Sequence, residues 1–140
     1  MQPEIEIADG TVSELAALLR DAVAAALERH PERAATLRAL RERVLVRAED
    51  TGEVVTLVFA DGRVSIADGD AGGARIRILG DRDAISALTR VPLRRGLPDL
   101  RSEATRTVLL RQLGGELTVR GLIVRGPHFR RVLQLLAAGA

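Results

Sequence analysis

The sequence predicts one α+β domain, in which a single, mostly antiparallel sheet of about five strands is covered on one face by helices. Three observations favour this class. Apolar residues recur at helical spacing at both ends of the chain, they alternate as in strands in the middle, and no linker divides the two patterns. We therefore expect residues 1–140 to form one domain, with an N-terminal helical segment at 1–42 and a sheet-and-helix core at 43–140.

The N-terminal segment has the pattern of two helices. Thr11 and Glu14 have the spacing of a capping box, which predicts Thr11 as the N-cap of a helix near 12–29. The apolar positions behind this cap are Val12, Leu15, Leu19, Val23 and Leu27. Pro31 is typical of the first position of a helix and predicts a second helix near 31–42.

The pattern then changes to the period of strands. Val44 and Val46 alternate with their neighbours, and β-branched residues dominate the next stretch, so we expect strands near 43–48, 53–60 and 63–67. Asp61-Gly62 predicts the hairpin turn between the last two, because both positions of such a turn need positive φ. A Gly-rich loop leads to a further strand at 75–78, whose arginines we expect to face solvent.

The second half alternates helices and turns. Asp81 predicts the cap of a helix that ends before Val91-Pro92, and Ser102 the cap of a helix near 102–113. A strand is expected at 116–120, with Gly121 marking a bulge or break before the apolar stretch 122–124. Gly126-Pro127 predicts the start of the last helix, with Pro127 at its first position.

The composition of the chain excludes several kinds of chemistry and partner. Hydrophobic residues make up 46% of the chain and aromatic residues 1%, so the core must be aliphatic, which makes a roomy interior easier to leave open. Cysteine is absent, which excludes disulfides and thiolate chemistry. All basic side chains are arginines and the net charge is only +2, so the high isoelectric point does not indicate a nucleic-acid partner.

No constellation of residues indicates catalysis, a metal or a cofactor. No candidate nucleophile is related by spacing to either histidine, His30 or His128, so structural or surface roles are expected for both. The acidic loop residues Asp61, Asp68 and Asp70 lack the ligand pattern of a calcium loop and fit turn chemistry instead. We therefore expect a protein that is not an enzyme.

The order of motifs in the second half resembles the sterol-carrier-protein domain, also called the non-specific lipid-transfer domain. The resemblance rests on the hairpin from Val54 to Ile66, the Gly-rich loop and strand 72–78, and the capped helix from Asp81 to Leu88. It continues in the segment Gly115-Glu116-Leu117-Thr118-Val119-Arg120-Gly121 and the Leu-rich last helix. The resemblance implies a five-stranded sheet whose covering helices enclose an apolar tunnel for sterols, acyl chains or other lipids. It covers about residues 44–137, within which the connection 92–106 is longer and more charged than in that family.

We therefore expect a cytoplasmic, non-catalytic carrier of a lipid-like or other hydrophobic small molecule, with no stable membrane insertion. No apolar stretch approaches the roughly 20 residues needed to span a bilayer. The candidate pocket residues are Leu57, Phe59, Ile76, Ile78, Leu117, Val119, Phe129 and Leu133. The alternative is a protein-interaction or regulatory domain with a filled core, whose amphipathic first helix docks a partner or a second copy of the chain.

Overall fold

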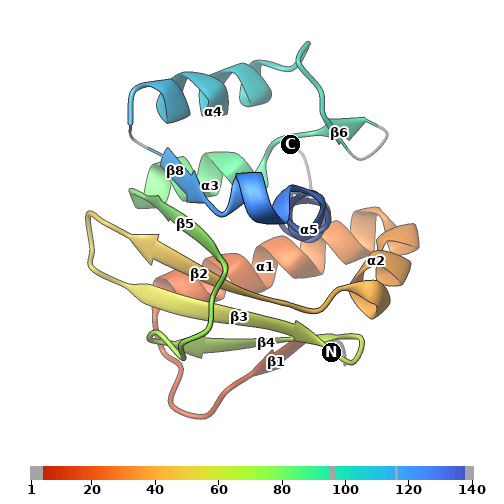
Figure 1. Ribbon diagram of the computed structural model, residues 1–140, viewed down its shortest axis with the longest axis vertical. Helices are drawn as coiled ribbons and strands as arrows, with labels where there is room; N and C mark the ends of the chain where they lie inside the picture. Colours follow the sequence, from red (N-terminus) through yellow and green to blue (C-terminus); the bar gives the residue numbers. More distant parts are fainter. Residues whose placement is uncertain (1–4, 95–96, 116, 138–140) are drawn as a thin grey trace.

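The computed structural model describes residues 5–94, 97–115 and 117–137, which form strands and helices in mixed order (Figure 1). The strands are β1 (Ile5–Ile7), β2 (Glu42–Ala48), β3 (Val54–Ala60), β4 (Arg63–Asp68), β5 (Ile76–Gly80), β6 (Leu93–Arg94), β7 (Leu97–Pro98) and β8 (Leu117–Arg120). The helices are α1 (Glu14–Arg29), the 3-10 turn η1 (Pro31–Arg33), α2 (Ala34–Ala39), α3 (Arg82–Thr89), α4 (Glu103–Leu113) and α5 (Leu122–Leu136). The predicted strand residue Glu116, the turn residue Gly96 and the end of the chain at 138–140 lie outside the described residues.

The fold is α+β, as predicted, but the topology of the main sheet differs from the prediction. Six strands lie in the order β1-β4-β3-β2-β5-β8, and the pairs β1–β4 and β2–β5 are parallel. The expectation of about five mostly antiparallel strands was wrong for two reasons. The short segment Ile5–Ile7 adds a strand at one edge, and the chain crosses from β4 over β3 and β2 before it forms β5.

The hairpin at the centre of the sheet is confirmed. β3 and β4 pair antiparallel around Asp61-Gly62, with Ala60 opposite Arg63. Asp61 and Gly62 have φ values of 55° and 75°, which a two-residue turn of this hand requires.

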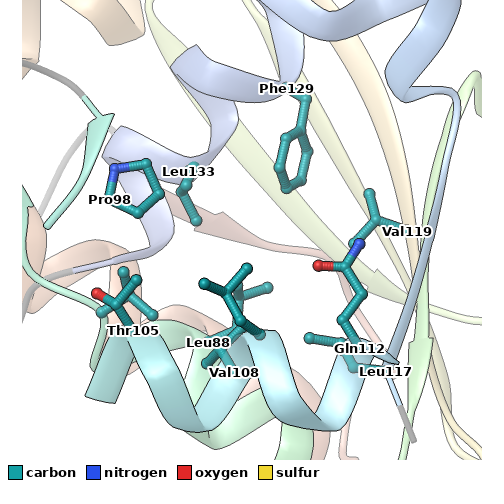
Figure 2. Close-up of a pocket in the computed structure, with 11 residues that line it drawn as sticks. Leu88, Pro98, Thr105, Val108, Gln112, Leu117, Val119, Phe129 and Leu133 are labelled. Carbon is teal, nitrogen blue, oxygen red and sulfur yellow. The ribbon is translucent and has the colours of Figure 1, made fainter. Parts of the chain in front are cut away.

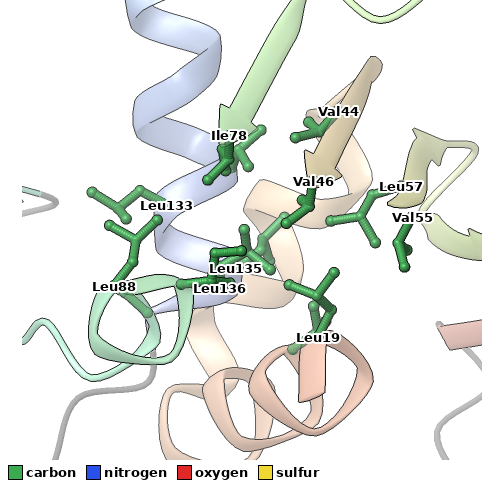
Figure 3. Close-up of a cluster of buried hydrophobic side chains, with 14 of the residues drawn as sticks. Leu19, Val44, Val46, Val55, Leu57, Ile78, Leu88, Leu133, Leu135 and Leu136 are labelled. Carbon is green, nitrogen blue, oxygen red and sulfur yellow. The ribbon is translucent and has the colours of Figure 1, made fainter. Parts of the chain in front are cut away.

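One face of the sheet and the helices that cover it build the hydrophobic core (Figure 3). Alternate strand residues such as Val46, Leu57 and Ile78 point toward Leu19 of α1 and Leu136 of α5. All five side chains are at most 2% exposed. Because full burial of one such side chain contributes roughly 1.5–3 kcal/mol, this layer is the main source of stability.

The opposite face carries the arginines, as the alternation predicts, but part of it is covered. Arg43 and Arg47 are exposed, whereas Leu45 and its cross-strand partner Thr56 are 5% and 1% exposed. The crossing loop after β4 lies over this face, since the Thr56 hydroxyl donates to the Gly69 carbonyl and accepts from the Ala71 amide. The loop thereby satisfies a buried hydroxyl on a face that the strand pattern alone assigns to solvent.

The N-cap of the first helix lies two residues later than predicted. Ser13, and not Thr11, is the N-cap, and its hydroxyl oxygen accepts from the Ala16 amide at 3.1 Å. Two distant carboxylates complete the cap: Asp68, at the end of β4, accepts from the Val12 and Ser13 amides, and Glu53, just before β3, accepts from the Leu15 amide. Sequence spacing could not reveal these partners, because they come from distant strands and turns.

Hydrogen bonding lowers the pKa of both capping carboxyls. The pKa of Asp68 lies below its ordinary value, first because the Ser13 hydroxyl donates to it and then because of the Val12 amide. The pKa of Glu53 is lowered chiefly by the Thr51 hydroxyl, which donates to Oε1 at 2.8 Å. Both carboxylates therefore favour the folded state in their charged form.

The segment predicted as one helix at 31–42 is divided. Pro31 does open η1, but α2 ends at Ala39, and Glu42 already belongs to β2. Arg33 of η1 is 8% exposed, and its Nη1 donates to the Gln134 and Ala137 carbonyls at 2.9 and 2.7 Å. Burial lowers the pKa of this guanidinium, which nevertheless caps the C-terminal end of α5.

The last helix also begins earlier than predicted. α5 starts at Leu122 with Gly121 as N-cap, so Pro127 lies inside the helix and not at its first position. Gly121 has a φ of 94°, and a Cβ at this position would lie 2.2 Å from the Arg75 carbonyl oxygen. Because glycine tolerates this conformation and this close approach, α5 follows β8 directly, without the bulge or break that Gly121 was expected to mark.

Candidate functional site

An apolar cavity of about 100 Å³ lies between α3, α4, β8 and α5 (Figure 2). Side chains from all four elements and from the connection before α4 converge on it. Its lining residues are Leu88, Val91, Pro98, Thr105, Val108, Leu109, Gln112, Leu117, Val119, Phe129 and Leu133.

Local capping positions the two helices that form one side of the cavity. Asp81 accepts from the Ala84 amide at 2.7 Å and begins α3, and Ser102 accepts from the Ala104 amide at 3.1 Å and begins α4. Both caps are confirmed as predicted. Arg111 lies 3.6 Å from the Asp81 carboxylate and thus connects the end of α4 to the start of α3.

The chain between these helices closes the cavity at one end. It forms the short hairpin β6–β7, in which Leu93 lies opposite Pro98. The Asp99 amide donates to the Pro92 carbonyl at 2.9 Å and holds the base of the hairpin. Pro98 therefore reaches the cavity from a connection that the sequence pattern assigned only to irregular structure.

Two polar side chains interrupt the apolar lining. Gln112 is exposed, whereas Thr105 is 2% exposed and its hydroxyl has no hydrogen-bond partner within the described part of the chain. A buried hydroxyl without a partner costs roughly 1–3 kcal/mol. The cavity wall thus contains one polar group whose hydrogen-bonding capacity is unused.

The structure brings together half of the residues predicted to form the pocket. Leu117, Val119, Phe129 and Leu133 line the cavity. Leu57, Phe59, Ile76 and Ile78 lie instead in the packed layer between sheet and helices, where each is at most 1% exposed.

Sequence reasoning missed the contributions of α3, the hairpin connection and α4. The signal was present in α4, since Thr105, Val108 and Gln112 have the i, i+3, i+7 spacing of one helix face. The connection 92–106 departs from the pattern of the lipid-transfer domain, and no pocket residue was predicted there or in α4.

The two histidines lie outside this cavity lining. His30 Nδ1 is 3.7 Å from Glu32, near the surface. His128 lies within α5 and not in its first turn, and its Nδ1 is 3.1 Å from Oε2 of Glu42, whose side chain is 4% exposed. This pair connects α5 to the start of β2, a structural role of the kind expected for a histidine without a nucleophile.

The acidic loop residues have turn and capping roles. Asp70 accepts from the Gly72 amide, Asp61 pairs with Arg41 at 3.3 Å, and Asp68 caps α1. Within residues 5–94, 97–115 and 117–137, no group of three or more His, Asp or Glu side chains could hold a metal ion. No helix in this described part is long and apolar enough to cross a bilayer.

Comparison with known proteins identifies the architecture. No protein-family model matches the chain, and no curated protein sequence does. A solved structure described as a UbiJ-SCP2 ubiquinone synthesis protein superposes with a TM-score of 0.58 and 19% identity, over 86% of this chain and 90% of that one. A conserved hypothetical protein from Thermus thermophilus, described as possibly a sterol carrier protein, has a TM-score of 0.46 and 14% identity, over 94% and 90% of the chains. The protein described here therefore has the sterol-carrier-protein-like, or SCP2-like, fold.

Proposed function

We propose that this protein is a non-catalytic carrier that binds a lipid-like or other hydrophobic small molecule in the cavity between α4 and α5. The observation that carries the proposal is the cavity lining, in which nine of eleven side chains are apolar. Such a lining offers hydrophobic transfer energy of about 0.8 kcal/mol per buried methylene. Binding of this kind needs no reactive side chain.

The size of the cavity limits what it holds without rearrangement. Its volume of about 100 Å³ is below the roughly 300–1,000 Å³ of typical ligand pockets. A cavity of about 150 Å³ accepts a benzene ring, so a longer chain requires the walls to separate. The wall best suited to move is α4, since its principal contacts are with α3 and β8 alone.

The Thr105 hydroxyl suggests a ligand that is apolar with one polar group. A carbonyl, hydroxyl or carboxyl group near Thr105 would provide the hydrogen bond that this side chain lacks in the described structure. Hydrocarbons without such a group would leave the hydroxyl unpaired. We therefore propose fatty acyl or isoprenoid-like molecules with a polar end over pure hydrocarbons.

A second candidate is a protein-interaction domain with a filled core that acts as a monomer or a homodimer. It is favoured by the four predicted pocket residues Leu57, Phe59, Ile76 and Ile78, which are buried in the hydrophobic core and do not line the cavity. Under this alternative the cavity is a packing defect with no occupant.

Native mass spectrometry of freshly purified protein, followed by lipid extraction, distinguishes the two. A monomer with co-purified lipid supports the carrier, and a ligand-free dimer supports the interaction domain. A fluorescent fatty-acid analogue should then bind the wild-type protein and bind at least tenfold more weakly to Val119→Phe, which fills the cavity.

Val58→Phe is the matched control for this titration. Val58 is also a partly buried valine within a strand, but it does not line the cavity. Equal binding of the probe to both variants and the wild type would contradict the proposed site.

A further inference from the structure

The formal charge of the protein is divided unevenly along the sequence. Residues 1–89 contain eleven arginines and sixteen acidic residues, a net charge of −5, whereas residues 90–140 contain ten arginines and three acidic residues, a net charge of +7. In Figure 1, α4 lies at one end of the long axis of the molecule, and β1 and β4 lie at the other. The basic part of the sequence thus supplies the α4 end, and the acidic part the opposite end.

Large apolar side chains are exposed at the same end. Leu100, Leu109 and Leu110 are 67%, 41% and 69% exposed. Arg101 and Arg106 are exposed beside them and form no ion pair with a carboxylate of the described residues. We call these five residues, Leu100, Arg101, Arg106, Leu109 and Leu110, the α4 outer surface.

Helical spacing brings leucine and arginine together on this surface. Arg106 precedes Leu109 by three residues and Leu110 by four, so the three side chains are neighbours on one side of α4. Thr105 and Val108 line the cavity from another side of α4 (Figure 2). Leu109 lies at the boundary, since it lines the cavity and is also 41% exposed. One helix therefore carries part of the cavity lining and, next to it, an exposed surface that is both apolar and basic.

We propose that the α4 outer surface docks on an anionic lipid bilayer. Leucines that are exposed among arginines match an interface in which apolar side chains enter the headgroup region and guanidinium groups bind lipid phosphates. A nucleic acid would use the arginines but gain nothing from the leucines, and no aromatic residue is present there for base stacking. An acidic partner protein is the competing occupant, and vesicle binding separates the two.

This inference does not depend on the proposed carrier function, because docking is measured without any ligand in the cavity. The full chain should sediment with vesicles of phosphatidylglycerol and phosphatidylcholine in equal parts, and not with pure phosphatidylcholine vesicles. High salt should weaken the association, because screening acts on exposed charges. Failure to bind either vesicle would overturn the proposal and favour a protein as the occupant. Equal binding to both would also overturn it, because the arginines would then have no part in the association.

Two double variants test the named residues. Arg101→Gln with Arg106→Gln should weaken partitioning into the anionic vesicles about thirtyfold, at about tenfold per 1.4 kcal/mol and about 1 kcal/mol for each arginine. Leu100→Ser with Leu110→Ser should weaken it on the order of tenfold while leaving its salt dependence intact. Neither leucine lines the cavity and both are exposed, so an unchanged far-ultraviolet circular dichroism spectrum and urea midpoint check that these variants remain folded.

Exposed residues outside the α4 outer surface provide the controls. Arg47→Gln with Arg63→Gln removes the same charge from two exposed arginines of the sheet, and Val12→Ser removes an apolar side chain that is 88% exposed. Both should bind anionic vesicles within about twofold of the wild type. If they bind as weakly as the α4 variants, the association reflects overall composition and the assigned surface is wrong.

Discussion

Replacement of Gly121 by alanine should destabilise the protein severely, because two separate costs fall on this residue. Its φ of 94° is a conformation that residues with a Cβ adopt at about 1–3 kcal/mol. The new Cβ would also lie 2.2 Å from the Arg75 carbonyl oxygen, where real Cβ contacts stay above 3.0 Å, so the backbone must move. Overpacking of this kind adds roughly 1–3 kcal/mol, which gives a total of about 4 kcal/mol.

The structural consequence should be concentrated at the end of the sheet. Gly121 joins β8, which pairs with β5, to α5, which carries Phe129 and Leu133 into the cavity. A displaced junction therefore separates β8 from β5 and changes the cavity wall as well as the core. A loss of about 4 kcal/mol is a large fraction of the roughly 5–15 kcal/mol that stabilises a typical domain.

Urea unfolding followed by far-ultraviolet circular dichroism measures this loss, and the absence of tryptophan and tyrosine makes fluorescence unsuitable. Gly69→Ala is the matched control, since Gly69 has a φ of 92° and a Cβ added there would meet no atom within 4 Å. It should lose only the conformational part, about 1–3 kcal/mol. If both variants are equally stable to within about 0.5 kcal/mol, close packing against Arg75 is not a source of strain and the reasoning fails.

Three further substitutions test the caps and the cavity. Asp68 has a folded-state pKa below its ordinary value of 3.8, so its contribution to stability is present above that pH and is lost as the pH falls through the folded pKa. Asp68→Asn should therefore reduce the drop in urea midpoint between about pH 5 and pH 3, and an unchanged drop would contradict the capping role. Arg33→Met should cost about 3 kcal/mol, because the Gln134 and Ala137 carbonyls lose a charged donor; a thermal melt within about 2 °C of wild type would refute this. Thr105→Val should stabilise the ligand-free protein by about 1 kcal/mol in urea, because it removes an unpaired buried hydroxyl, and a loss of stability would show that the hydroxyl is already satisfied.

Local signals in the sequence predicted most of the elements but not their arrangement. The hairpin at Asp61-Gly62 and the caps Asp81 and Ser102 were predictable because each depends on residues within a few positions. The parallel strand β1 was not, since three residues of alternating pattern carry almost no periodic signal. The helical start at 122–124 was missed for a related reason, because a short apolar stretch does not distinguish strand from helix.

The residues predicted for the candidate site fall into two groups, those that line the cavity and those that do not. Leu117, Val119, Phe129 and Leu133 were predicted because strand and helix patterns gave each an inward face. The same rule selected Phe59 and Ile76, which also point inward but contact protein on all sides. Whether an inward-facing side chain meets a neighbour or an empty space depends on where α4 lies, and its position follows from long-range packing that no local pattern encodes.

The short strand β1 covers one edge of the sheet by pairing with β4. It pairs along β4 from Ile5 to Ile7 and leaves only a three-residue strand at that edge of the sheet. Without it, β4 would present six residues of unpaired backbone, from Arg63 to Asp68, as a template for a strand of a neighbouring molecule. We therefore expect that an affinity tag or truncation that displaces these few residues leaves this edge of β4 unpaired. The purified protein would then form chains or aggregates through pairing of its sheets.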